Sequence, residues 1–153
     1  MNVEAIPVPP LDAWPAVVAL KESPVALASL KAMHLLGAAI VIGSVLAFDL
    51  RVLGWNKGIP VRVLAGHLLP LALAALVLIV PSGVALFALD ASILLHSTAL
   101  KFKLGLLCAA AGAAVFFRAC VYKETDSWDE YTPVPRLARL CAGVSIALWL
   151  GVL

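Results

Sequence analysis

Charged side chains are scarce in this 153-residue chain, since Asp, Glu, Lys and Arg make up 13% of it, against about 25% in an average soluble domain. Hydrophobic residues make up 63%. This excess of apolar over charged residues is typical of proteins built into a membrane. The chain also lacks a basic cluster with interleaved aromatic residues, so we expect no nucleic-acid partner.

Motifs of the common soluble enzymes are missing as well. The sequence has no glycine-rich nucleotide loop, no hydrolase nucleophile motif and no H-E-x-x-H zinc motif, so we do not expect it to be an enzyme by itself. Cys108, Cys120 and Cys141 show no C-x-x-C spacing and fall within or at the ends of apolar runs. Because thiol reactivity needs an exposed, electropositive setting, we interpret them as inert membrane thiols.

Long apolar runs dominate what the sequence does contain. A helix of about 20 residues is about 30 Å long, which matches the hydrocarbon thickness of a bilayer. Four runs of this kind occur, at about residues 24–50, 60–89, 97–122 and 134–153. We therefore predict an all-α integral membrane protein. Residues 24–153 form a four-transmembrane-helix bundle, and residues 1–23 form an extended segment followed by a short helix in the membrane interface.

Capping residues and prolines mark where these helices begin and bend. Ser23 followed by Pro24 predicts the start of the first span, because a hydroxyl caps free amides and proline suits the first helical position. Asp12 is placed to cap the short N-terminal helix. Pro70 and Pro81 lie within the second span, where each removes a hydrogen bond and predicts a kink.

Basic residues lie mostly on one side of the predicted bundle. With four spans, the connections after the first and third spans share a side. That side carries seven of the eleven basic residues, namely Arg51, Lys57, Arg62, Arg118, Lys123, Arg136 and Arg139. Since basic residues favour the cytoplasm, we predict that both termini are periplasmic. Trp128 and Tyr131, in the second of these connections, are expected at the membrane interface.

Small residues recur four positions apart in three of the spans. The three series are Ala39, Gly43 and Ala47; Gly105, Ala109 and Ala113; and Gly143, Ala147 and Gly151. In membranes such faces let helix backbones approach closely, so we interpret them as packing faces. Gly43 points away from the side that carries His34 and Asp49. Neither face of the first span suits bare lipid, which favours a homo-oligomer or other membrane subunits as partners.

His34 is the most informative candidate for a functional site. An imidazole buried in a span is costly unless it finds a partner. Neutral imidazole is a standard axial ligand of haem iron, and Gly37, one turn on, leaves room for a flat macrocycle. One interpretation is that His34 binds a metal or haem b. The other is that it hydrogen-bonds a carbonyl or hydroxyl group and only joins two helices.

His96 is the candidate second ligand, because it lies on the same predicted side of the membrane. Lys101 and Lys103 are placed to pair with haem propionates. Depth argues against the pair. His34 lies three residues inside Lys31, whereas His96 lies five residues outside Lys101, which amounts to a mismatch of roughly 12 Å at 1.5 Å per residue. The alternative for His96 is a solvated histidine at the interface.

Asp49 and Arg51 close the first span. Two residues apart on a helix they do not face each other, so each needs a partner elsewhere, such as the polar end of another helix. We interpret them as structural polar contacts; the alternative is a proton or ion relay. His67, near the cytoplasmic end of the second span, is interpreted as a partly hydrated interfacial histidine.

Several short motifs between residues 30 and 118 carry a resemblance to a family. They are His34-Leu35-Leu36-Gly37, Asp49-Leu50-Arg51-Val52-Leu53-Gly54, Ile59-Pro60-Val61-Arg62, Leu68-Leu69-Pro70, Ser82-Gly83 and Lys101-x-Lys103. On these residues the chain resembles an uncharacterised family of small bacterial four-span membrane proteins. The resemblance implies four helices and the bacterial inner membrane, and nothing about a substrate. A looser similarity, of architecture only, is to small membrane b-type cytochromes and copper-resistance membrane proteins.

Two functions from different classes remain open. The first is an electron-transfer protein that holds one b-type haem through His34, with or without His96, and passes electrons from a periplasmic donor to the quinone pool. The second is a non-catalytic accessory or scaffold subunit of a larger membrane complex, with His34 and Asp49 as buried polar contacts. A haem needs two imidazoles at one depth, or one with an open site, whereas a scaffold needs neither.

Overall fold

The computed structural model describes residues 10–121, Trp128 and residues 133–153. Within these ranges every regular element is a helix, so the all-α prediction is confirmed. In chain order the elements are η1 (Leu11–Ala13), α1 (Pro15–Glu22), α2 (Pro24–Leu53), α3 (Val61–Leu89), α4 (Ala91–Leu94), α5 (Thr98–Phe116), the π-helical turn η2 (Phe117–Val121) and α6 (Arg136–Val152).

Three helices are long and apolar enough to cross a membrane. They are α2, α3 and the continuous helix Thr98–Cys120, which joins α5 to η2. The helix α6 has 17 residues, which is at the short end of the usual range of about 17–25 for a span. The chain is therefore a multi-pass membrane protein by length and composition of its helices, and a fourth crossing by α6 stays a prediction.

The start of α2 agrees with the sequence prediction, and that of α1 does not. The Ser23 hydroxyl accepts a hydrogen bond from the amide of Ala26 at 3.3 Å, and Pro24 occupies the first turn. Asp12 does not cap α1, because the capping position is Trp14. Instead Asp12 accepts a hydrogen bond from the hydroxyl of Ser92 in α4. This hydrogen bond lowers the pKa of the Asp12 carboxyl.

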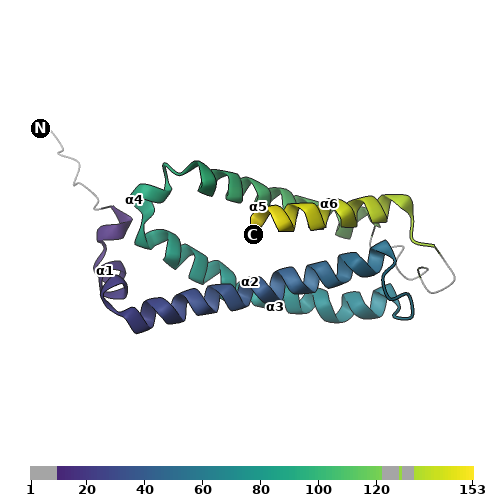
Figure 1. Ribbon diagram of the computed structural model, residues 1–153, viewed down its shortest axis with the longest axis horizontal. Coiled ribbons are helices and arrows are strands. Elements are labelled where there is room, and N and C mark those ends of the chain that lie inside the picture. Colours follow the sequence, from purple (N-terminus) through teal and green to yellow (C-terminus); the bar gives the residue numbers. More distant parts are fainter. Residues whose placement is uncertain (1–9, 122–127, 129–132) are drawn as a thin grey trace, which may run out of the picture.

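The N-terminal segment is tied to the far end of α3 by polar contacts. Besides the Asp12–Ser92 hydrogen bond, Lys21 of α1 forms an ion pair with Asp90, with 3.8 Å between Nζ and Oδ1. Figure 1 shows α1 and α4 together at one end of the molecule and the α2–α3 turn at the opposite end. These contacts fix α1 at the end of the helices, which is where an interfacial helix would lie.

The main packing partner of α2 is α3, and α6 packs against both α5 and α2. Figure 1 shows α3 crossing α2 and then diverging from it toward α4, while α6 runs back beside α5 and stops partway along it. Pro70 and Pro81 both lie inside α3. Because a proline removes an internal hydrogen bond, these positions give a physical reason for bending in this helix.

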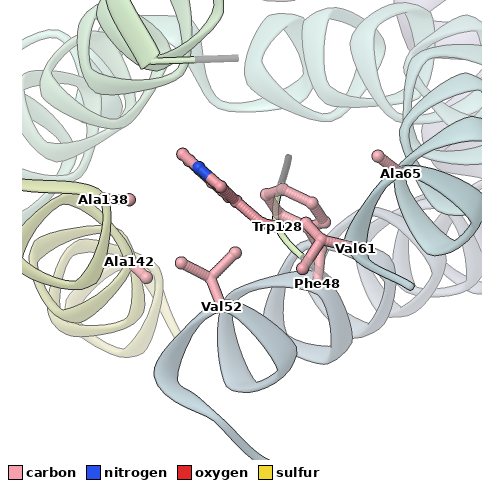
Figure 2. Packing of buried hydrophobic residues seen from close by; sticks show 7 residues of the cluster. All are labelled: Phe48, Val52, Val61, Ala65, Trp128, Ala138 and Ala142. Atoms are coloured by element: carbon pink, nitrogen blue, oxygen red, sulfur yellow. The ribbon is translucent and has the colours of Figure 1, made fainter. Parts of the chain in front are cut away.

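A hydrophobic cluster closes the end of the bundle at the α2–α3 turn. It consists of Phe48, Val52, Val61, Ala65, Trp128, Ala138 and Ala142. Figure 2 shows the Trp128 indole lying between the α6 residues and the side chains of Phe48 and Val61. Trp128 is 3% exposed, so its side chain packs inside the chain, and its expected depth at the membrane interface stays a prediction. Tyr131, which shared that expectation, lies outside the described residues.

Candidate functional site

His34 joins α2 to α3 through a side-chain hydrogen bond. Its Nδ1 lies 3.1 Å from the Oγ of Ser82. The next residue, Gly83, lies directly against the ring, since a Cβ atom built on Gly83 would be 3.0 Å from Cε1 of His34. The absence of a side chain at Gly83 therefore lets the imidazole reach Ser82. The His34 motif and the Ser82-Gly83 motif, 48 residues apart, form one contact.

The hydrogen bonds of Ser82 are compatible with one particular tautomer of His34. The Ser82 hydroxyl directs its single hydrogen to backbone carbonyls of its own helix, those of Leu78 and Ile79. With its hydrogen so directed, the hydroxyl accepts from His34, and that arrangement requires the tautomer with the proton on Nδ1. In the neutral imidazole the lone pair then lies on Nε2. This is the arrangement of a metal-ligating histidine, whose other ring nitrogen donates to a partner that fixes its orientation.

Gly37 serves the helix crossing and leaves no room for a macrocycle. A Cβ atom on Gly37 would lie 3.1 Å from both the backbone nitrogen and the Cβ of Ile79. The space beside Gly37 is thus filled by the backbone of α3, and the interpretation that it admits a flat cofactor is wrong. Close approach of two helices at a glycine is the usual geometry of small-residue contacts in membranes.

His96 and the two lysines lie in other parts of the fold. His96 is exposed in the connection between α4 and α5, and its Nδ1 donates to the backbone carbonyl of Ser92 at 3.0 Å. His34 lies in the body of α2, ten residues after its first residue, Pro24, or about 15 Å along the helix. This placement does not favour His96 as a second ligand. Lys101 and Lys103 are exposed in the first turns of α5.

Asp49 and Arg51 are both buried, with exposed fractions of 5% and 4%, and each has its own partner. The guanidinium of Arg51 donates through Nε to the carbonyl of Ile59 and through Nη2 to that of Lys57, the latter at 3.1 Å. Arg51 thereby closes the α2–α3 turn. Asp49 hydrogen-bonds the side chain of Ser145 on α6. The expectation that the two residues find separate partners agrees with this geometry.

Sequence reasoning missed the two serines that serve these sites. Ser82 is the single hydroxyl residue of α3 and Ser145 is that of α6. In a helix that is otherwise apolar, a lone hydroxyl is a natural partner for an imidazole or carboxyl on a neighbouring helix. The scarcity of hydroxyl groups in these helices was the signal available in the sequence. It does not identify which helices pair.

The remaining titratable side chains form no metal centre in the part of the chain that the structure describes. His67 is exposed and its Nδ1 donates to the carbonyl of Val63 in its own helix, at 2.8 Å. No group of three or more His, Cys, Asp or Glu side chains within the described ranges is arranged to hold a metal ion. A single-histidine haem site does not require such a group, so this finding bears on metal ions alone.

Comparison with known proteins finds no relative of this chain. The resemblance on the short motifs of residues 30–118 therefore stays a prediction, and the function must be argued from the geometry. No family model, no curated protein and no solved structure matches the chain.

Proposed function

We propose that this chain is a non-catalytic scaffold or accessory subunit of the bacterial inner membrane, whose outward-facing small residues bind transmembrane helices of a second copy or of another subunit. In this proposal four helices cross the bilayer, α6 being the fourth, and both termini are periplasmic. His34 and Asp49 hold the helices of one copy together, through Ser82 on α3 and Ser145 on α6.

Glycines that face outward carry the proposal. Among the described residues, a Cβ atom at Gly43, Gly105, Gly112 or Gly143 would have nothing within 4 Å apart from its own chain neighbours and helix backbone, and all four positions are exposed. Gly43 and Gly105, which belong to the predicted packing faces of α2 and α5, are thus not covered by another helix in the part of the chain that the structure describes. In lipid, small residues favour helix contacts because they let backbones approach. Faces of this kind that are left open by their own chain are suited to helices from outside it.

The low internal burial of α5 supports the same proposal. The most apolar stretch of α2 is 44% buried inside the chain, whereas that of the α5 helix is 6% buried. Figure 1 shows that α6 accompanies α5 over only part of its length. Most of α5 is therefore available to lipid or to another membrane helix.

We expect Gly43→Leu to weaken self-association of the protein in lipid vesicles by about tenfold, which corresponds to about 1.4 kcal/mol. Self-association is measured by energy transfer between donor- and acceptor-labelled copies as the protein is diluted with lipid. Gly66→Leu is the matched control. Gly66 is also open and exposed, but its neighbours four residues away are Arg62 and Pro70, so it belongs to no small-residue series.

A wild-type protein that stays monomeric at all protein-to-lipid ratios would contradict the self-associating form of the proposal. If Gly43→Leu and Gly66→Leu weaken association equally, the small-residue face is not the interface. Association that is lost in Gly43→Leu alone supports the proposal.

A second candidate function is electron transfer through one haem b held by His34 alone, and the contact between the Nδ1 of His34 and the Ser82 hydroxyl favours it. Because Nδ1 is engaged by Ser82, Nε2 is the nitrogen that would hold the iron, and Ser82 would fix the plane of the ring. Bound haem would supply one-electron chemistry, with a periplasmic donor and quinone as the reaction partners.

Visible absorption distinguishes the two candidates. For a haem protein we expect a Soret band that sharpens on reduction, disappears in His34→Ala and persists in His96→Ala, because His96 is engaged with Ser92 outside α2. Ser82→Ala should broaden the band, since the ring loses its fixed orientation. A well-folded wild-type protein that stays colourless after haem is supplied would exclude the haem function and leave the scaffold.

A further inference from the structure

We infer that Asp49 is a proton-binding site, whose carboxyl group carries a proton in the folded bundle and exchanges it at the end where the α2–α3 turn lies. The inference does not require a partner subunit or a cofactor. It rests on the burial of the carboxyl, on an oxygen without a partner, and on the groups that surround it.

Asp49 is buried without the contacts that would stabilise a charge. Its side chain is 5% exposed, and its Oδ2 has no hydrogen-bond partner among the described residues. A carboxylate in such surroundings needs a cation or several donors, because an isolated buried charge costs far more than a neutral group. Taking up a proton removes the charge and leaves a carboxyl that needs fewer partners.

The cations nearest in sequence are engaged elsewhere. Arg51 directs its guanidinium to the carbonyls of Lys57 and Ile59. Between described residues the recorded ion pair joins Lys21 and Asp90, at the other end of the bundle. The one partner recorded for the Asp49 side chain is the Ser145 hydroxyl. A single neutral donor does not offset the cost of burying a carboxylate.

The elements packed around this end of α2 present thiols, apolar groups and two exposed arginines, namely Arg118 on η2 and Arg139 on α6, whose Nη2 would lie 3.5 Å from a Cβ built on Gly54. From α6 come Ser145 and, one turn earlier, the half-buried Cys141, which lies within electrostatic range of both Asp49 and the exposed Cys120 of η2. From α3 the buried residues at this end are Val61 and Ala65, while Arg62 and His67 are exposed.

The position of Asp49 in α2 sets the side from which the proton comes. Asp49 lies four residues before Leu53, the last residue of the helix, or about 6 Å from its end. His34 lies fifteen residues earlier, or about 22 Å away along the helix. Exchange therefore occurs with the side that faces the α2–α3 turn, which is the cytoplasm in the proposed topology.

Dicyclohexylcarbodiimide, an apolar reagent that modifies protonated carboxyl groups, tests the inference in the full-length protein in lipid. We expect modification at Asp49 at neutral pH, located by mass spectrometry, and its loss as the pH rises. Asp49→Asn should abolish it, and the exposed Glu22 and Asp90 should stay unmodified. Ser145→Ala should keep it, because that variant removes the donor that favours the charged form.

Infrared spectroscopy covers the case in which the reagent cannot reach the site. A protonated Asp49 gives a carboxylic-acid C=O stretch at neutral pH that is missing from Asp49→Asn. Because the amide is nearly isosteric with the neutral acid, this variant should fold. Identical spectra of wild type and variant in this region, together with no modification of Asp49, would overturn the inference, as would loss of modification in Ser145→Ala.

Discussion

Replacing Trp128 with alanine is expected to lower the free energy of unfolding by about 3–5 kcal/mol, the range for truncating a large buried aromatic side chain. Trp128 is 3% exposed and belongs to the cluster that joins α2, α3 and α6. On the α6 side of this cluster, the residues that Figure 2 labels are the small Ala138 and Ala142. These two α6 side chains are therefore too small to fill the cavity left by the indole.

The measurement is unfolding of the purified protein by dodecyl sulfate, followed by loss of the helical signal. Trp55→Ala is the matched control, because Trp55 is 69% exposed in the α2–α3 turn and its truncation should change stability by no more than about 0.5 kcal/mol. Trp128→Phe should retain most of the stability. Equal stabilities of Trp128→Ala and Trp55→Ala would show that Trp128 does not anchor the α6 end of the bundle.

Helix boundaries could be predicted from the sequence because they depend on local groups. Ser23 accepts from Ala26 three residues on, and Ser97 accepts from Leu100 in the same way at 3.4 Å. The prediction that Asp12 caps the N-terminal helix was wrong for a related reason. It has the right side chain for a cap, but an accessible hydroxyl on Ser92, far away in sequence, is its partner instead. Local rules cannot include such a competitor.

The burial of Trp128 could not be predicted, because it depends on residues distant in the chain. An aromatic residue in an acidic connection suits the membrane interface. The Trp128 indole fits into a space bounded by small side chains, namely those of Ala138, Ala142 and Ala65. Small residues in α6 indicate close packing, but the sequence does not say whether a helix or an indole fills the space.

The candidate site could be predicted in its residues and only partly in its contacts. His34 and Asp49 stood out because polar groups in a span need partners, and the structure provides Ser82 and Ser145. The side of α2 was largely predictable, since helical geometry groups Gly37, Val41, Val45 and Asp49 with His34. Of these, Gly37, Val41 and Asp49 are buried, whereas Val45 and His34 are half-buried. The pairing of helices was not, because each helix is apolar nearly all round and carries no directional pattern.

The second large effect is expected at Gly37, where the backbones of α2 and α3 meet. We expect Gly37→Ala to lower the free energy of unfolding by about 1–3 kcal/mol, the usual cost of overpacking. The added Cβ would lie 3.1 Å from the Ile79 nitrogen and 3.3 Å from its Cα. Since these are backbone atoms, no side-chain rotation relieves the contact and α3 itself must move. Gly37→Leu should cost more and impair insertion or folding.

Gly43→Ala and Gly43→Leu are the matched controls on the same helix, because a Cβ at Gly43 meets no atom within 4 Å. We expect them to leave the unfolding of a single copy nearly unchanged in dodecyl sulfate, while Gly37→Ala shifts it. The Gly37 variants should also disturb the His34–Ser82 hydrogen bond one turn away, visible as a change in the nitrogen NMR signal of the His34 ring. If Gly37→Ala were as stable as Gly43→Ala with an unchanged His34 signal, the space beside Gly37 would not be filled by α3. A flat cofactor at that position would then again be compatible with the fold.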